Sequence, residues 1–140
     1  MYEKRNLTYV LTALEAIEKI FIYAEGVNDS DSFFALNDQM NFNASQTLLL
    51  VIGEESKKID QGLKDSQNEI PWHLISNLRN RIAHDYRSID PFITWDIITN
   101  HLGSLKNALI EMLDSIVFEQ ELLEEVLNTS FYRHLKYLLK

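Results

Sequence analysis

Residues 3–24 read EKRNLTYVLTALEAIEKIFIYA and set the fold class of the chain. Apolar side chains recur every three or four positions along this stretch, at Leu7, Val10, Leu14, Ile17 and Phe21. This is the spacing of one face of an α-helix. No stretch alternates between apolar and polar side chains with period two over six residues. Only four glycines and two prolines interrupt the 140 residues. The sequence therefore predicts an all-α protein, an antiparallel up-and-down bundle of four to five helices.

The same spacing predicts the elements that follow. We expect a short turn over residues 32–36, a second long helix over residues 38–63 and a loop over residues 64–69. Gly53 lies in the middle of that second helix, where it allows another backbone to approach closely. A third helix is expected to begin at Pro71, a residue that the first turn tolerates, and to end near residue 84 or 85.

Asp90 followed by Pro91 marks the start of a fourth helix, because Asp caps a helix N-terminus and Pro fits its first position. Apolar residues at helical spacing extend this helix to about Met112. The helical pattern then continues over residues 113–139, with residues 128–130 as the expected break.

The composition excludes several classes of protein. With 46% hydrophobic and 24% charged residues, the chain resembles ordinary soluble globular proteins, and its length suits one domain over residues 1–140. The absence of cysteine excludes disulfides, thiol catalysis and Cys-ligated metals. The apolar run at residues 48–52 is too short to span a membrane, and the first residues lack the pattern of a signal peptide. We expect a cytoplasmic protein without a membrane segment.

The net charge of −8 disfavours broad binding to nucleic acids, because an acidic surface repels phosphates. The charge is unevenly distributed. Residues 71–90 carry three arginines against two aspartates, whereas the segments before and after them are both net acidic. A small, selective site for an anion therefore remains compatible with an acidic protein.

The most informative stretch, residues 72–86, has two arginines, an asparagine, a histidine and a tyrosine in its last eight positions: Arg79, Asn80, Arg81, His84 and Tyr86. Histidine transfers protons near neutral pH, and arginine stabilises phosphate charge without deprotonating. Arg79 and His84 lie about 140° apart on a regular helix, so they converge only if the helix end distorts or a second chain completes the site. The alternative is a structural role, in which these residues cap the helix C-terminus.

The pattern Arg79-x4-His84-x-Tyr86 resembles the R-x(4–6)-H-x-Y signature of the HepT-like toxins in the HEPN superfamily. Asn80, directly after the arginine, also fits that family. The flanking residues agree with it as well. They are Ile52-Gly53-Glu54-Glu55, which is similar to the I-G-E stretch of the family's second helix, Ile70-Pro71-Trp72, and Asp90 with Trp95.

The resemblance covers about residues 6–113 and leaves residues 114–140 as a C-terminal helical extension. It implies a helical bundle that forms a homodimer, with the motifs of both protomers lining one cleft. A two-fold dimer is also the commonest assembly of soluble oligomers. Such a dimer would bring Arg79 and His84 from two chains together.

The activity implied by the resemblance is metal-independent endoribonuclease cleavage of RNA, such as tRNA or mRNA, without a cofactor. In that reaction the 2′-OH attacks the adjacent phosphate. His84 acts as general acid or base, Arg79 stabilises the phosphate, and Asn80 supports them. DNA would resist cleavage because it lacks the 2′-OH.

Tyr86 has a separate implied role. In the family this tyrosine is AMPylated by a cognate nucleotidyltransferase antitoxin of the MNT type, which silences the toxin of a type VII-like toxin–antitoxin module. A phosphate beside the Arg and His side chains would exclude RNA by charge and volume. The alternative is that Tyr86 is an aromatic residue that packs on the end of the bundle.

The remaining charged groups receive structural interpretations. His73, His101 and His134 lack metal-ligand spacing, and Glu54-Glu55 lack the E-x-x-H partner of a di-iron bundle, so no metal site is expected. Lys57-Lys58 is interpreted as a solvated face, with contact to RNA as the alternative. Without a Gly-rich phosphate loop, or a G-S-x(n)-D-x-D pattern, the chain is expected neither to bind ATP nor to be the nucleotidyltransferase.

Residues 111–127 carry six acidic side chains and no basic one, with apolar residues at helical spacing. We interpret them as an ordinary packed helix with an acidic outer face; the alternative is an arm that stabilises a dimer or contacts the antitoxin. Two rival hypotheses for the whole chain stay open. It could be a non-catalytic partner or substrate-binding subunit of a nucleotidyltransferase, or a purely structural helical dimer.

Overall fold

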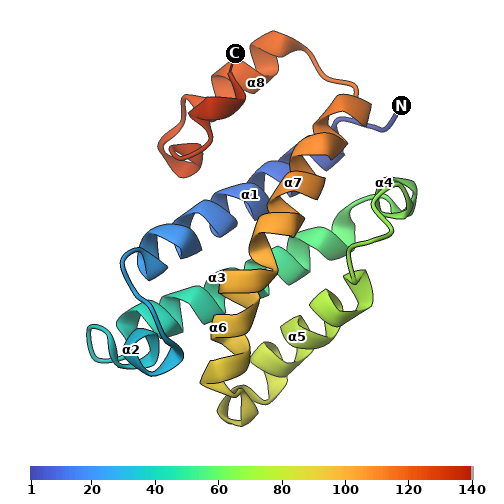
Figure 1. The fold of residues 1–140 in the computed structure, drawn as a ribbon. Coiled ribbons are helices and arrows are strands. Elements are labelled where there is room, and N and C mark those ends of the chain that lie inside the picture. Colours follow the sequence, from blue (N-terminus) through green and yellow to red (C-terminus); the bar gives the residue numbers. More distant parts are fainter. Residues whose placement is uncertain (140) are drawn as a thin grey trace.

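The computed structural model describes residues 1–139 and is built almost entirely from helices (Figure 1). The described residues contain no β-structure beyond one parallel bridge between Tyr2 and Ile116. The all-α bundle predicted from the sequence is therefore confirmed. The α-helices within these residues are α1 Arg5–Ala24, α2 Ser30–Ala35, α3 Met40–Lys58, α4 Gln61–Asp65, α5 Trp72–His84, α6 Pro91–Asn100, α7 Leu102–Met112 and α8 Gln120–Leu127.

Helix α1 lies at the centre of the hydrophobic core. Its side chains at Val10, Leu11, Leu14, Ile17 and Ile20 are completely buried, whereas Phe21, the last residue of the predicted stripe, is partly buried. Helix α3 packs against α1 on one side and against α5 on the other, so that α5 is separated from the centre of the core (Figure 1). Of the α5 side chains, Ile82 is the buried one. This position leaves most of α5, including the motif at its C-terminal end, at the surface.

The prediction of one helix over residues 38–63 is wrong, because α3 ends at Lys58 and a separate short helix, α4, follows. The chain is extended at Ile59 and Asp60 between them. The buried side chain of Asn6 causes this break. Its Oδ1 accepts from the Asp60 backbone N–H at 2.9 Å, and its Nδ2 donates to the Asp60 carboxylate at 3.2 Å. These bonds hold the chain in a non-helical turn.

The prediction of one helix from Pro91 to Met112 is also wrong in part. Asp90 accepts from the Phe92 backbone N–H at 2.9 Å and Pro91 occupies the first turn, as predicted. The helix is then interrupted at His101, where φ is −125°, and divides into α6 and α7. Thr99 donates to the Trp95 carbonyl at 2.9 Å just before this point, and such side-chain bonds to the helix backbone bend helices.

The C-terminal segment differs most from its prediction. Residues 116–119 are not helical, because Tyr2 pairs with them as a short bridge: its N–H donates to the Ser115 carbonyl and its carbonyl accepts from Val117 N–H, both at 2.9 Å. The amphipathic helix is limited to α8, which ends just before the predicted break at residues 128–130. Two 3₁₀ turns follow and lie against α1 (Figure 1).

The third predicted helix is confirmed as α5, although Pro71 occupies the position before its first residue and not the first turn itself. The predicted turn over residues 32–36 is the helix α2, with Asp29 as its N-cap, accepting from the Ser32 N–H at 2.8 Å. None of the helices within residues 1–139 is long and apolar enough to cross a membrane.

Candidate functional site

The site begins with a close approach of two helices at Gly53. A Cβ atom at this position would lie only 2.5 Å from the Cβ of Arg79 and 3.4 Å from the carbonyl oxygen of Ile75. No residue larger than glycine fits here without moving one of the helices. The predicted role of Gly53 in a close backbone approach is therefore confirmed, and the neighbour is the motif arginine.

This approach places Arg79 beside the acidic residue that follows Gly53. The Nε atom of Arg79 donates to Oε1 of Glu54, and its Nη1 donates to Oδ1 of Asn80 at 3.0 Å. The arginine side chain is half-buried, at 28% exposure. No residue within the described part of the chain accepts a hydrogen bond from its Nη2. The guanidinium is thus held on two sides, and the third nitrogen can donate to an anion.

His84 is the last residue of α5 and is exposed. None of the side-chain hydrogen bonds within residues 1–139 involves its ring. Because α5 is a regular helix up to this point, Arg79 and His84 lie on different sides of it, about 140° apart. The structure brings Arg79 and Asn80 together but does not join His84 to them within one chain.

Tyr86 begins a 3₁₀ turn, Tyr86–Ser88, that follows α5. Its hydroxyl donates to Oδ1 of Asn43 on α3, and burial raises the pKa of this hydroxyl above its ordinary value. The turn is also bonded internally. The Ser88 hydroxyl donates to the Asp85 carbonyl at 2.8 Å and accepts from Arg81 Nη2 at 3.4 Å. Tyr86 therefore docks the end of the motif onto a second helix.

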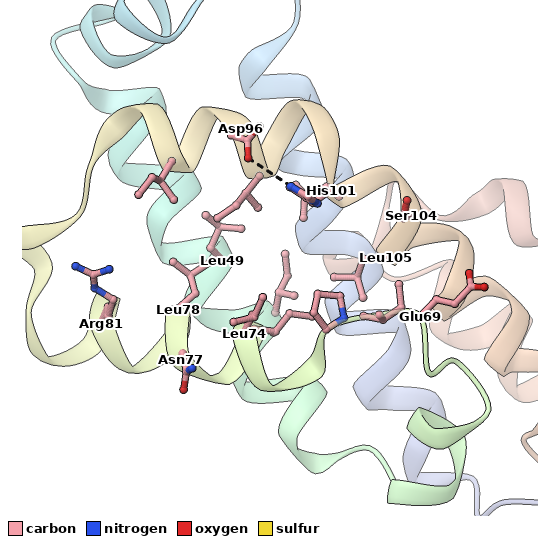
Figure 2. Close-up of a pocket in the computed structure, with 17 residues that line it drawn as sticks. Leu49, Glu69, Leu74, Asn77, Leu78, Arg81, Asp96, His101, Ser104 and Leu105 are labelled. Atoms are coloured by element: carbon pink, nitrogen blue, oxygen red, sulfur yellow. Dashed lines mark ion pairs between the residues drawn. The ribbon is translucent and has the colours of Figure 1, made fainter.

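A pocket of about 680 Å³ lies between α5 and α6–α7 (Figure 2). Leu74 and Leu78 of α5 and Leu105 of α7 lie in the space between these helices (Figure 2). Residues of positive and negative charge also line the pocket, among them Arg81 and Asp96. None of the four predicted site residues lines this pocket, but the lining residues Asn77 and Arg81 lie seven and three positions before His84 and so share its side of α5.

Two of the other histidines lie beside carboxylates. His101 lies 3.4 Å from Asp96 at the surface, and the ring of His134 hydrogen-bonds Glu15 at 2.6 Å. Among residues 1–139, no group of three His, Asp or Glu side chains is arranged to hold a metal ion. Lys57 is exposed, and Lys58 lies 3.5 Å from Glu55.

Two residues of the site were not singled out from the sequence. Glu54 belonged to the I-G-E stretch of the resemblance, but nothing in the spacing connected it with Arg79, 25 positions further along the chain. Asn43 carried no signal at all, since a single asparagine in a helix has no motif. Both contacts depend on the packing of α5 against α3.

The chain is thus an all-α helical domain with an Arg–Asn pair and a nearby exposed histidine at the end of one helix. Comparisons with known proteins give the family. A protein-family model described as "Ribonuclease HepT-like" matches residues 13–112. The chain belongs to the HepT-like ribonuclease family, which confirms the resemblance seen in the sequence and the class of enzyme it implied.

Individual relatives agree with this assignment. A protein named "Probable ribonuclease HepT" from Thermococcus cleftensis is 30% identical over 74% of this chain and 92% of its own length. One named "Putative RNase MJ0127" from Methanocaldococcus jannaschii is 29% identical over 86% of this chain and 98% of its own length. A third, from the same organism, is named "Gamma-glutamylcyclotransferase and putative RNase MJ0434"; it is 24% identical over 77% of this chain, which spans only 47% of it. No solved structure matches.

Proposed function

We propose that this chain is the toxin of a two-gene toxin–antitoxin module and acts as a metal-independent endoribonuclease. One observation carries the proposal. In a member of a ribonuclease family, Arg79 is held by Glu54 and Asn80 with Nη2 left to bind an anion, five positions before an exposed histidine. A fixed cation and an unpartnered histidine are the groups that phosphodiester cleavage by transesterification requires.

In the proposed reaction, the 2′ oxygen of a ribose bonds to the adjacent phosphorus, and the bond from phosphorus to the 5′ oxygen breaks. The products are a 2′,3′-cyclic phosphate and a 5′-hydroxyl. His84 takes the proton of the 2′-OH or delivers one to the departing 5′ oxygen. Arg79 donates from Nη2 to a non-bridging oxygen and stabilises the charge that accumulates there.

The proposal includes a homodimer, because Arg79 and His84 do not converge within one chain. We place the second copy on the face of α5 and α6 where Leu74 and Ile93, both about half exposed, adjoin the 680 Å³ pocket. Arg81 and Asp96 on this face have opposite charges, so a two-fold pairing can match each with the other. Light scattering of an Ile93→Glu variant should then show a monomer, and a cleavage assay should show that this monomer lacks RNase activity.

The activity is tested with the purified full chain on tRNA and mRNA, and on an oligonucleotide with a 2′-deoxy substitution. Wild type should cleave RNA to cyclic phosphate ends without added metal and should leave the 2′-deoxy position intact. His84→Ala and Arg79→Ala should be inactive, whereas His73→Ala and Arg87→Ala, which change exposed residues of the same types, should not. Absence of cleavage by an intact dimer would contradict the proposal and favour a non-catalytic partner of a nucleotidyltransferase.

Silencing is proposed to occur by AMPylation of Tyr86 by a cognate nucleotidyltransferase antitoxin. The position supports this, since Tyr86 is exposed and follows His84 by two residues, so an added phosphate would lie near the reacting groups. Mass spectrometry of protein co-expressed with a nucleotidyltransferase encoded beside it should detect an adenylate on Tyr86. Unmodified Tyr86 in a co-expressed, silenced toxin would contradict this part.

A further inference from the structure

The bond between Tyr86 and Asn43 has a consequence for the histidine two residues before it. Within residues 84–89, most side-chain and backbone bonds are local. Asp85 N–H donates to the Arg81 carbonyl at 2.8 Å, and Ser88 N–H donates to the Asp85 carbonyl at 3.0 Å. These bonds shape the turn after α5 but do not connect it with another helix.

Among the described side-chain hydrogen bonds of this turn, the one from Tyr86 to Asn43 reaches a second helix. Asn43 lies in the first turn of α3, the helix that also carries Gly53 and Glu54 further along. Asn43 and Glu54 are eleven positions apart, which is about 20° more than three full helical turns. The two residues therefore lie on nearly the same side of α3. One face of α3 thus contacts the motif at both ends, through Arg79 and through Tyr86.

We propose that Asn43 is a positioning residue for His84. By accepting the Tyr86 hydrogen bond, it docks the turn onto α3 and holds the C-terminal end of α5, and with it His84, in one place relative to Arg79. This inference rests on the proposed ribonuclease function for its catalytic part. The docking itself is a property of the folded chain and can be measured separately.

The chemistry of the proposed modification gives this bond a second role. When a nucleoside triphosphate AMPylates Tyr86, the phenolic oxygen bonds to the α-phosphorus, pyrophosphate leaves, and the phenolic proton passes to a base. The aryl phosphodiester oxygen that results has no hydrogen to donate to Asn43 Oδ1. The modification therefore undocks the turn in addition to adding charge and volume beside the site.

The variants Tyr86→Phe and Asn43→Ala separate these effects, since each removes the bond without adding volume. Each should lower kcat for RNA cleavage by about three- to tenfold, the range for one hydrogen bond, with KM unchanged. The double variant should be no worse than either single variant, because the two residues act through the same bond. Asn43→Asp keeps an acceptor for the hydroxyl and should retain wild-type kcat.

Matched controls are Tyr9→Phe and Asn107→Ala, which alter the same residue types on α1 and α7, away from the motif. Neither should change kcat. Wild-type kcat in Tyr86→Phe, or losses that multiply in the double variant, would overturn the positioning role.

Hydrogen exchange measures the docking without relying on activity. The amides of Asp85, Ser88 and Ile89 should exchange faster in Tyr86→Phe, in Asn43→Ala and in AMPylated protein than in wild type or Asn43→Asp. Unchanged exchange in all of these would overturn the proposed docking. A wild-type chain that cleaves no RNA would instead contradict the proposed function, while exchange would still decide whether Asn43 docks the turn.

Discussion

The end of α5 and the C-terminal segment carry similar side chains in opposite surroundings. At the end of α5, His84 is exposed and Tyr86 donates to an amide oxygen. In the C-terminal segment, His134 binds Glu15, which is 1% exposed, and Tyr137 donates to the Glu18 carboxylate at 2.6 Å. The type of a residue therefore does not by itself decide its role. His134 has a buried carboxylate partner, whereas the ring of His84 has no hydrogen-bond partner among residues 1–139 and is free for the proposed chemistry.

The difference between the two histidines is tested most directly by replacing each of them in turn. His84→Ala should lower the rate of RNA cleavage on the order of 10²–10⁴-fold, because a general acid or base is lost, and should leave the melting temperature unchanged. His134→Ala should retain activity in whatever fraction of the protein is folded. Single-turnover cleavage together with thermal denaturation of both variants checks this. Equal losses of activity in both would contradict the distinction.

The second largest effect concerns the stability conferred by His134. Among residues 1–139, its removal leaves the buried Glu15 carboxylate with the backbone N–H of residue 134, at 3.0 Å, as its remaining hydrogen bond. The free energy of unfolding should fall by about 2–3 kcal/mol, as measured by urea denaturation. His101→Ala removes a surface pair with Asp96 instead and should change stability by less than about 0.5 kcal/mol. If the two variants are equally stable, the C-terminal segment is not held by this pair.

One glycine substitution tests the close packing of α5 against α3, and a second one, on α7, is its control. Gly53→Ala introduces a Cβ only 2.5 Å from Arg79 and should cost about 1–3 kcal/mol while also lowering RNA cleavage, because α5 must move. Gly103→Ala on α7 meets no atom within 4 Å and should add about 0.5–1 kcal/mol of stability, since alanine favours a helix. Denaturation and cleavage assays on both variants measure the two effects. A tolerated Gly53→Ala would show that the close approach is not required.

A smaller effect is expected from Glu54→Gln, which keeps an acceptor for Arg79 Nε but removes its charge. Because an ionised acceptor strengthens the bond, RNA cleavage should fall by about three- to tenfold, with the loss in kcat. Glu55→Gln, on the neighbouring residue that pairs with Lys58, is the matched control and should behave as wild type. Increased activity in Glu54→Gln would indicate that Glu54 competes with the substrate for Arg79.

The smallest effect is the pH dependence of the stability that Tyr137 confers. Burial, first, and then Glu18 raise the pKa of Tyr137 above its ordinary value, so the folded state keeps the proton longer than the unfolded state. The stability from Tyr137 is therefore fully present below about pH 10, the ordinary tyrosine value, and is lost as pH rises further. Melting temperatures measured from pH 8 to pH 11 should fall less steeply for Tyr137→Phe than for wild type. Parallel curves would contradict the contribution of Tyr137.

Much of the fold could be predicted because helix positions follow from local patterns. The apolar stripe of α1, the Asp90–Pro91 start of α6 and the limits of α5 depend on residues close in sequence. The breaks at Asp60 and within residues 113–119 could not be predicted. The first depends on Asn6, 54 positions away, and the second on the pairing of Tyr2 with residues 115–117. Bonds between distant parts of a chain leave no periodic signal.

The sequence by itself determined the helical class, the family and the motif Arg79-x4-His84-x-Tyr86, because these are properties of residue type and spacing along one helix. Only the tertiary structure decided that Glu54 holds Arg79 and that Asn43 docks Tyr86. It also decided that His134 is a structural residue, paired with buried Glu15. The physical reason is that burial and hydrogen-bond partners arise when helices pack. A side chain acquires its charge partner, and so its role, from residues that the sequence places 25 to 119 positions away.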